Sequence, residues 1–428
     1  MKKKKLEIKS SNIVGKKILK ENKEMIKLFT KVTTMALIFF VTLNCIVGVS
    51  LGAEKIPVGV LTGFTGDMAP YAPNWYQGAL LSVKEVNEAG GPLGQELEVF
   101  PADDRCEVEG GMVAARKLVT MNRVVGIVGG ISDVIVALID FIKDNKVPII
   151  SPTAGTIRLD KIGGEYIFRT VSSDSFDGRA IAKFIIDKGW NKVGMIALNT
   201  EGLKSVERAA MGYLEEAGVE IVSREIVNPG QATYRSTIRK VFTTNPDVVV
   251  CAIDYDTAIT IYKERFEMGY TIPIIEPPDP TCADLIENVG EVIAEGIYGV
   301  APAPPRTIVY QTFLSRYKEF TGEEVMIYTP NFYDAMNILA LAIEAAGKAE
   351  NEAVAKYIKD VANPPGVVVN TFAQGAVELR KGNGINYHGV TGPCDFDEYG
   401  NVVTSNSMMQ VQNGKWVEVE FYEAEDFE

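Results

Sequence analysis

The chain has 428 residues, more than one hydrophobic core usually serves, so we expect two lobes. Apolar residues make up 46% and charged residues 23%, an ordinary globular composition that argues against disorder. The net charge is −13, and it becomes −21 without residues 1–53, which hold 11 lysines and 3 glutamates. Because such an acidic surface repels phosphate backbones, we expect no nucleic-acid partner.

The first 53 residues follow the order of a secretory signal peptide. A lysine-rich segment reaches Lys31, and an apolar run from Met35 ends in small residues at Ala53. We predict cleavage after Ala53 and an exported product, in the periplasm or on the outer face of the cytoplasmic membrane. A start at Met25 would give a more typical signal peptide, so the start stays open. The alternatives are an uncleaved membrane anchor and lipid attachment at Cys45.

The rest of the chain alternates twice between strand and helix patterns, and it has no other apolar run of membrane-spanning length. This alternation predicts right-handed βαβ units, and hence an α/β fold with two Rossmann-like parallel-sheet lobes. The first series predicts strands at 56–63, 96–104, 124–130 and 147–153, and helices at 78–91, 112–122 and 133–146. After an extended segment at 165–175, the second predicts strands at 191–199, 219–227, 246–254 and 272–278, and helices at 178–190, 203–218, 234–245 and 257–270.

Three helical patterns without strands follow a proline-rich segment, and the tail alternates and turns at glycines like a β-hairpin. Three helices cannot form an α/β lobe alone, so we expect them to cover the first lobe while the hairpin joins the second. Three crossings between the lobes would then form a hinge on which the lobes can close. The helices are expected at 308–321, 331–347 and 352–362, and the crossings near 171–174, 300–304 and 386–392. The N-terminal lobe would comprise 54–173 and 302–386, and the C-terminal lobe 174–301 and 387–428.

Catalytic machinery is missing from the sequence. Any catalytic triad would have to use the single histidine, His388, and there is no G-x-S-x-G elbow and no phosphate-binding loop. The glycines of residues 124–130 lack the spacing of a dinucleotide-binding loop. We therefore expect a binding protein rather than an enzyme, with no cofactor.

Neither the acids nor the cysteines form a metal-binding pattern. An acidic cluster lacks fixed ligand spacing, so a solvated loop is preferred over a metal site. No CxxC pair occurs, which argues against structural zinc. Cys251 lies in an apolar run and is expected to be a buried thiol, while the pairing of Cys106, Cys282 and Cys394 stays open. The acidic cluster consists of Asp103, Asp104, Glu107 and Glu109.

Two strand ends carry chemistry suited to a ligand. One predicted strand runs through Gly129-Gly130 into a helix, where the amide groups and the Ser132 hydroxyl could hold a carboxylate, with Asp133 pointing away. Plain helix capping explains this fragment equally well. The other place is the turn 152–156, whose threonines supply hydroxyls. Both follow strands of one lobe, at the sheet edge where open α/β sheets bind ligands.

The sequence resembles the branched-chain amino-acid-binding family of ATP-driven (ABC) transporters, which has the type I periplasmic-binding-protein fold. The resemblance covers essentially the whole chain after the signal segment. It is carried by TGDMAPYAPNWYQGALLSVKEVNEAGGPLGQELEVFPADDRC, VVGIVGG, VPIISPTAGTIRL, YIFRTVSSD, EGLKSV, AEGIYGVAP, NFYDAMNILALAIEAAG and GPCDFDEYG, in the order of the family. It implies a monomeric receptor that delivers a small molecule to a membrane permease.

By position, the resemblance also implies the binding residues. The first lobe would hold the ligand carboxylate, and an acid of the second lobe would pair with its ammonium group. Glu276 is a second candidate for that acid, after Asp279. The family typically has Tyr-Gly where this sequence has Asn199-Thr200, which changes the shape and polarity of the pocket. The implied residues are Tyr71, Ser132, Thr153, Ala154, Thr156, Asn199, Tyr255 and Asp279.

The favoured function is therefore an exported receptor for an amino acid or a related small zwitterion. The alternative in the same fold is a receptor for an amide, urea or an aromatic carboxylate, favoured by Asn199. A dehydrogenase-like enzyme is disfavoured by the glycine spacing, and a sensory ectodomain by the absence of an output domain in this sequence. A ligand-binding regulator is disfavoured because no helix-turn-helix precedes the first strand.

Overall fold

The computed structural model describes Met25, Lys27 and residues 54–303 and 305–423. The chain from Glu54 onward is one compact unit. The predicted signal cleavage, the apolar run before Ala53 and the lipid-attachment alternative at Cys45 lie outside the described residues. Within the described ranges, no helix is both long and apolar enough to cross a membrane.

The first lobe is built on a parallel sheet with the strand order β2-β1-β3-β4-β5. Neighbouring residues of its strands face opposite sides, so that Val60 packs on one side and Leu61 on the other. Both sides are covered by apolar helices, as expected for a parallel sheet. The strands are β1 (Ile56–Thr62), β2 (Leu97–Asp103), β3 (Ile127–Gly129), β4 (Ile149–Ser151) and β5 (Ile167–Arg169).

The second lobe contains a seven-stranded sheet in the order β15-β14-β10-β9-β8-β6-β7. Its strands from β6 to β10 pair in parallel, and the β14–β15 hairpin extends it by antiparallel pairing of β14 with β10. The chain is thus an α/β protein with two parallel sheets, as predicted. The strands are β6 (Lys192–Leu198), β7 (Glu220–Val227), β8 (Val248–Ala252), β9 (Ile274–Glu276), β10 (Tyr298–Pro302), β14 (Asn406–Gln412) and β15 (Lys415–Tyr422).

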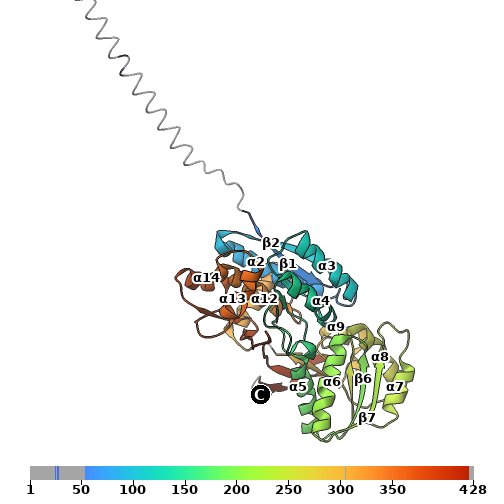
Figure 1. Cartoon of the computed structure of the whole chain (residues 1–428). Helices are drawn as coiled ribbons and strands as arrows, with labels where there is room; N and C mark the ends of the chain where they lie inside the picture. Colours follow the sequence, from blue (N-terminus) through green and yellow to red (C-terminus); the bar gives the residue numbers. More distant parts are fainter. Residues whose placement is uncertain (1–24, 26, 28–53, 304, 424–428) are drawn as a thin grey trace, which may run out of the picture. The chain divides into compact units, whose positions relative to one another are not determined.

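Helices cover both sheets and are long enough to connect parallel strands. The first lobe carries α2 (Ala72–Glu88), α3 (Val108–Thr120) and α4 (Ser132–Asn145), with the short helices η1 (Pro92–Gly94) and η2 (Ile157–Leu159). The second carries α5 (Asp174–Asp187), α6 (Glu201–Glu216), α7 (Arg235–Phe242), α8 (Tyr255–Glu267), α9 (Ala283–Val289) and α10 (Glu291–Ala294). Figure 1 shows these two groups of elements in blue and in green to yellow.

The helices after the second sheet return to the first lobe. Helix α12 packs against α2, β3 and β4, and nearly all of its side chains are buried. Figure 1 shows these helices, in orange, beside the blue elements of the first lobe. They are α11 (Ile308–Thr321), α12 (Thr329–Ala346), α13 (Asn351–Ala362) and α14 (Phe372–Arg380).

A small sheet that the sequence did not predict has one strand before α14 and two strands after it. The strands are β11 (Val367–Val369), β12 (Ile385–Gly389) and β13 (Gly392–Pro393), all too short for a clear periodicity. Phe396 and Val402 still pack in the core of the first lobe. The third crossing therefore follows Val402, later than the predicted 386–392, because apolar side chains hold this segment to the first lobe.

Candidate ligand-binding site

A cavity of about 140 Å³ lies between the two lobes. Its walls combine hydroxyls and carboxylates with apolar side chains, as in many sites for small ligands. The first lobe contributes Asp67, Met68, Trp75, Cys106, Ile131, Ser132, Asp133, Thr153 and Tyr328. The start of α5 and the rest of the second lobe contribute Asp174, Asp177, Thr200, Gly202, Leu203, Val206, Asp254, Pro277, Pro278 and Asp279.

The first-lobe wall carries two of the predicted hydroxyls. Ser132 begins α4, and its Oγ accepts a hydrogen bond from the Thr156 amide at 3.3 Å, which leaves its own O–H to donate to a ligand. The residue before it, Ile131, provides no side-chain cap, so the first amides of α4 can also hold an anion. Thr153 Oγ1 instead donates to the Gly130 carbonyl at 3.2 Å, so it can only accept from a ligand.

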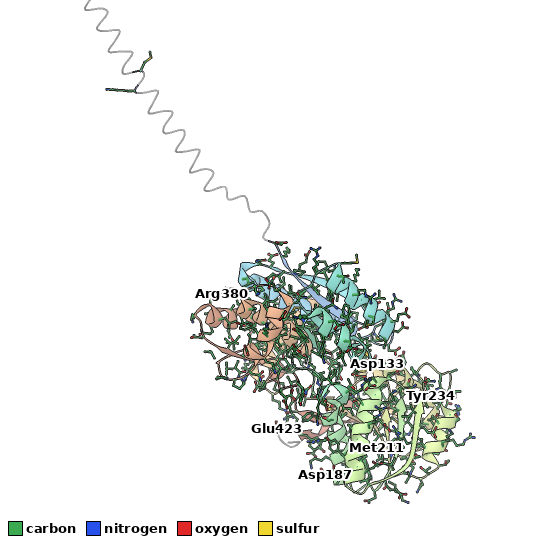
Figure 2. All side chains as sticks on the ribbon, viewed as in Figure 1. Asp133, Asp187, Met211, Tyr234, Arg380 and Glu423 are labelled. Atoms are coloured by element: carbon green, nitrogen blue, oxygen red, sulfur yellow. The ribbon has the colours of Figure 1, made fainter. Side chains whose placement is uncertain are left out.

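Asp133 differs from its prediction, because it lines the cavity rather than pointing away. Both of its carboxylate oxygens accept from the Glu201 amide at 3.0 Å. Figure 2 labels Asp133, which comes from α4 of the first lobe. The amide belongs to the first residue of α6, so an acid of one lobe caps a helix of the other.

The predicted turn residues Ala154 and Thr156 are fully buried and lie behind the lining residues. Thr156 Oγ1 donates to a Glu201 carboxylate oxygen at 3.0 Å, and the Ile157 amide donates to Ser205 Oγ at 2.9 Å. These bonds join the turn to α6 of the second lobe. The Arg169 guanidinium holds the turn from behind, by donating to the carbonyls of residues 154, 155 and 156.

The predicted aromatic residues support the cavity from one side. Tyr71 is buried, and its hydroxyl donates to the Asp279 carbonyl at 2.9 Å across the two lobes. Its ring stacks on Trp75, which lines the cavity, with centroids 5.7 Å apart. The Tyr255 ring meets Tyr71 edge-on at 6.5 Å, and its hydroxyl accepts from Asn288. Tyr71 and Tyr255 therefore touch the wall rather than the cavity itself.

Of the two candidate acids, Asp279 lines the cavity and Glu276 does not. Burial raises the pKa of Asp279 to about 6, the Asp254 charge adds to this rise, and a hydrogen bond from Tyr328 opposes it. Glu276 is fully buried elsewhere and accepts from the hydroxyls of Tyr262 and Thr281. Of the two candidate acids, Asp279 is therefore the one that reaches the cavity.

Asn199 does not line the cavity, although its neighbour Thr200 does. Asn199 is exposed, and its side-chain amide donates to Asn228 Oδ1 at 3.2 Å. Its carbonyl oxygen accepts from Lys204 at 2.8 Å. The residue at this position that faces the ligand space is Thr200, one place further along the chain.

Asp174 and Asp177, at the start of α5, line the cavity but were not predicted. Both are 7% exposed. Burial raises the pKa of Asp177 to about 7, opposed by a hydrogen bond from Asn406, and the Asp279 charge adds to the rise. A sequence signal was present, since two acids spaced three apart directly precede an apolar helical pattern at the first crossing.

The four cysteines that the structure describes, Cys106, Cys251, Cys282 and Cys394, are free thiols, and Cys251 is fully buried as predicted. Cys106 lines the cavity, and its sulfur accepts from the Met68 amide at 3.3 Å. In the part of the chain that the structure describes, no group of three or more His, Cys, Asp or Glu side chains could hold a metal ion.

The sequence profile of a family described as "Periplasmic binding protein" matches residues 55–415. The chain belongs to this family. Its members are binding receptors rather than enzymes and act outside the cytoplasm. Among curated relatives, the leucine-, isoleucine-, valine-, threonine- and alanine-binding protein of Pseudomonas aeruginosa is 23% identical over 317 residues, which cover 72% of this chain and 83% of the relative.

Solved structures share the fold of this periplasmic binding protein. A branched-chain amino-acid transporter substrate-binding protein of Streptococcus pneumoniae, in complex with isoleucine, has a TM-score of 0.73 at 23% identity and covers 86% of this chain and 99% of its own. A solute-binding protein of R. palustris, in complex with benzoate, has a TM-score of 0.71 at 17% identity, covering 86% and 96%. Two structures of one fold thus hold different ligands, so the ligand must be argued from the cavity.

Proposed function

We propose that this periplasmic binding protein captures an amino acid or a related small zwitterion and delivers it to the permease of an ABC transporter. The observation that carries the proposal is the pairing of opposite chemistries in one cavity. The Ser132 hydroxyl and the start of α4 suit a carboxylate, and the Asp279 carboxylate suits an ammonium group. The relatives that bind leucine, isoleucine and valine support the same class of ligand.

Hydrogen bonds between the lobes explain how ligand binding would favour a closed arrangement of the two lobes. Asp133, Thr156 and Ile157 of the first lobe bond to Glu201 and Ser205 at the start of α6. These residues adjoin the cavity, so a ligand that bridges its walls favours the same closed arrangement. We propose that the closed protein, as a monomer in the periplasm or on the outer face of the membrane, presents both lobes to the permease.

The alternative ligands are less well supported by the cavity. A receptor for an amide or urea was favoured by Asn199, which lies outside the lining. An aromatic carboxylate such as the benzoate of the related structure could use the start of α4, but it would bring no cation to the aspartates of the cavity. A zwitterion can place its ammonium group beside the aspartates and its carboxylate at the start of α4.

The test is calorimetric titration of the purified protein with the twenty amino acids, urea, acetamide and benzoate. We expect saturable one-to-one binding by at least one amino acid and none by benzoate. The proposal fails if no compound with both an amine and a carboxylate binds, or if benzoate binds more tightly than every amino acid.

A further inference from the structure

We propose that the ligand of this cavity carries a second cationic group, so that the protein is a receptor for a basic amino acid. This inference rests on the proposed function and narrows its class of ligand. Six aspartates line the cavity, and among its described lining residues there is no lysine, arginine or histidine. One of these aspartates is buried with an oxygen that has no partner, and it begins the helix at the first crossing.

Three of the six aspartates already have another role or face solvent. Asp133 caps α6, and Asp254 caps α8 by accepting from the Thr257 amide at 2.8 Å. Asp67 is exposed to solvent. The remaining three, Asp174, Asp177 and Asp279, cap no helix and are hydrogen-bonded to neutral side chains, those of Ser205, Asn406 and Tyr328.

The buried carboxylate of Asp174 is the strongest evidence for a second cationic group in the ligand. The residue is 7% exposed and lines the cavity, and its Oδ2 has no hydrogen-bond partner among the residues that the structure describes. It does not cap α5, because Ser173 does so through the Ser175 amide. Its other oxygen, Oδ1, packs against Gly155 so closely that a Cβ added at Gly155 would lie only 1.9 Å from it. A buried carboxylate oxygen without a donor is costly unless a ligand completes it.

The protein supplies little positive charge to these acids. Arg169 is the cation that lowers the pKa of Asp174, yet its guanidinium is bonded to three carbonyls and to Asp160. Burial and the neighbouring Asp177 raise the pKa of Asp174 well above its usual range. Asp177 has only the neutral amide of Asn406 as a donor, at 2.9 Å.

A neutral zwitterion does not balance this set of charges. Its single ammonium can meet Asp279, but Asp174 and Asp177 then have no cationic partner in the ligand, which also adds a carboxylate to the cavity. A basic amino acid brings one more positive charge. Its two cationic groups can meet Asp279 and the pair Asp174 and Asp177. A metal ion is the other cation to consider, but no group of the described side chains is arranged to hold one.

The apolar part of the cavity also fits an extended cation. Trp75, Met68, Leu203 and Val206 line it together with the acids. Long basic side chains bury their methylene stems on apolar surface while the charged end reaches polar groups. The cavity thus offers contacts to each part of such a molecule, from carboxylate to stem to terminal cation.

The test compares L-lysine with L-norleucine, which has the same chain length without the terminal ammonium, by calorimetric titration of the full-length mature protein at pH 7.5. We expect L-lysine to bind at least about 30-fold more tightly, since hydrogen bonds between charged groups discriminate by about 10- to 100-fold. Asp174→Asn and Asp177→Asn should each reduce this ratio about tenfold. Asp187→Asn, an exposed aspartate at the far end of the same helix and labelled in Figure 2, should leave it unchanged.

The outcomes separate this inference from the proposed function. If L-norleucine binds as tightly as L-lysine, the second cation is refuted while the amino-acid receptor stands. If neither binds and cadaverine, the diamine of lysine, does, the cationic ligand stands and the amino-acid receptor fails. If no amino acid and no amine binds, both fail. A variant that does not unfold cooperatively on heating is not folded and is set aside. The ratio of the affinities for L-lysine and L-norleucine, measured on the unchanged protein, then decides the inference.

Discussion

The two walls of the cavity are built in different ways. The first-lobe wall takes its polar groups from residues directly after two adjacent strands, Ser132 after β3 and Thr153 after β4. The opposite wall collects Asp174, Asp177 and Asp279 from the first crossing and from the loop after β9. The first wall also carries Asp67 and Asp133, but Asp67 is exposed to solvent and Asp133 caps α6, so the Ser132 hydroxyl and the start of α4 remain for a carboxylate. The second wall is acidic, and one cavity can therefore separate the recognition of a carboxylate from the recognition of an amine.

The largest expected effect comes from the point where the two walls meet. Gly155→Ala would place a Cβ at 1.9 Å from Asp174 Oδ1, so the carboxylate must move. Gly155 has no left-handed backbone angle, so alanine itself is not strained there. We expect affinity for L-lysine to fall about 100-fold or more, as measured by calorimetry, because the acidic wall loses its position.

The control for this change is Gly212→Ala in α6, where nothing lies within 4 Å of the added Cβ. Its affinity should equal that of the unchanged protein, and its melting temperature should rise slightly because alanine favours a helix. Unchanged affinity in Gly155→Ala, with a normal melting temperature, would contradict the role assigned to Asp174.

A smaller effect should follow from pH, and it should come from the acidic wall alone. Burial raises the pKa of Asp177 to about 7 and that of Asp279 to about 6. A cation favours the charged carboxylates, so binding lowers both pKa values and releases protons. Affinity for L-lysine should therefore rise about tenfold from pH 5.5 to 7.5 and level off above pH 8.

The groups that face these acids allow the source of this pH dependence to be checked. Asp177 faces Asp174, Asn406 and Asp279, and Asp279 faces Asp174, Asp254 and Tyr328. In this range none of them loses a positive charge, so the sign is set by the acids. Asp177→Asn should flatten the profile. Affinity that falls with rising pH would show that the acids do not meet a cation.

The smallest expected effect concerns Asn199. Because its side chain bonds to Asn228 and Lys204 outside the cavity, Asn199→Ala should change affinity by less than about twofold. Thr200→Ala, one residue on, should change it more, since Thr200 lines the cavity. A large loss of affinity in Asn199→Ala with none in Thr200→Ala would contradict this structure, because it would show that Asn199 rather than Thr200 faces the ligand.

The sequence predicted most of the fold because its signals are local. Strands of the two parallel sheets are short apolar runs such as Val248–Ala252, and their helices show regular apolar spacing, so the alternation is visible along the chain. The hairpin β14–β15 was visible for the same reason. Strands β11 and β13 were missed because strands of two or three residues carry no period of their own, and β12 and helix α14 were missed as well.

The site was predicted in part for the same physical reason. Ser132 and Thr153 follow strands directly, so their place at the sheet edge follows from the βαβ order. Asp174 and Asp177 follow the last strand of the first lobe but begin a helix of the second, so their place depends on how the crossing turns. Tyr328 is far along the chain, in a left-handed conformation at φ 64°, and reaches the cavity only through the packing of α12.

The most direct test of the two-walled cavity is a comparison of L-lysine and cadaverine, which differ by the carboxylate, on the unchanged protein and on Ser132→Ala. Calorimetric titration should show L-lysine binding more tightly than cadaverine, since only lysine can use the Ser132 hydroxyl and the start of α4. Ser132→Ala should weaken L-lysine about tenfold and leave cadaverine within about twofold. Equal weakening of both ligands, or tighter binding of cadaverine, would contradict the separation of carboxylate and amine between the two walls.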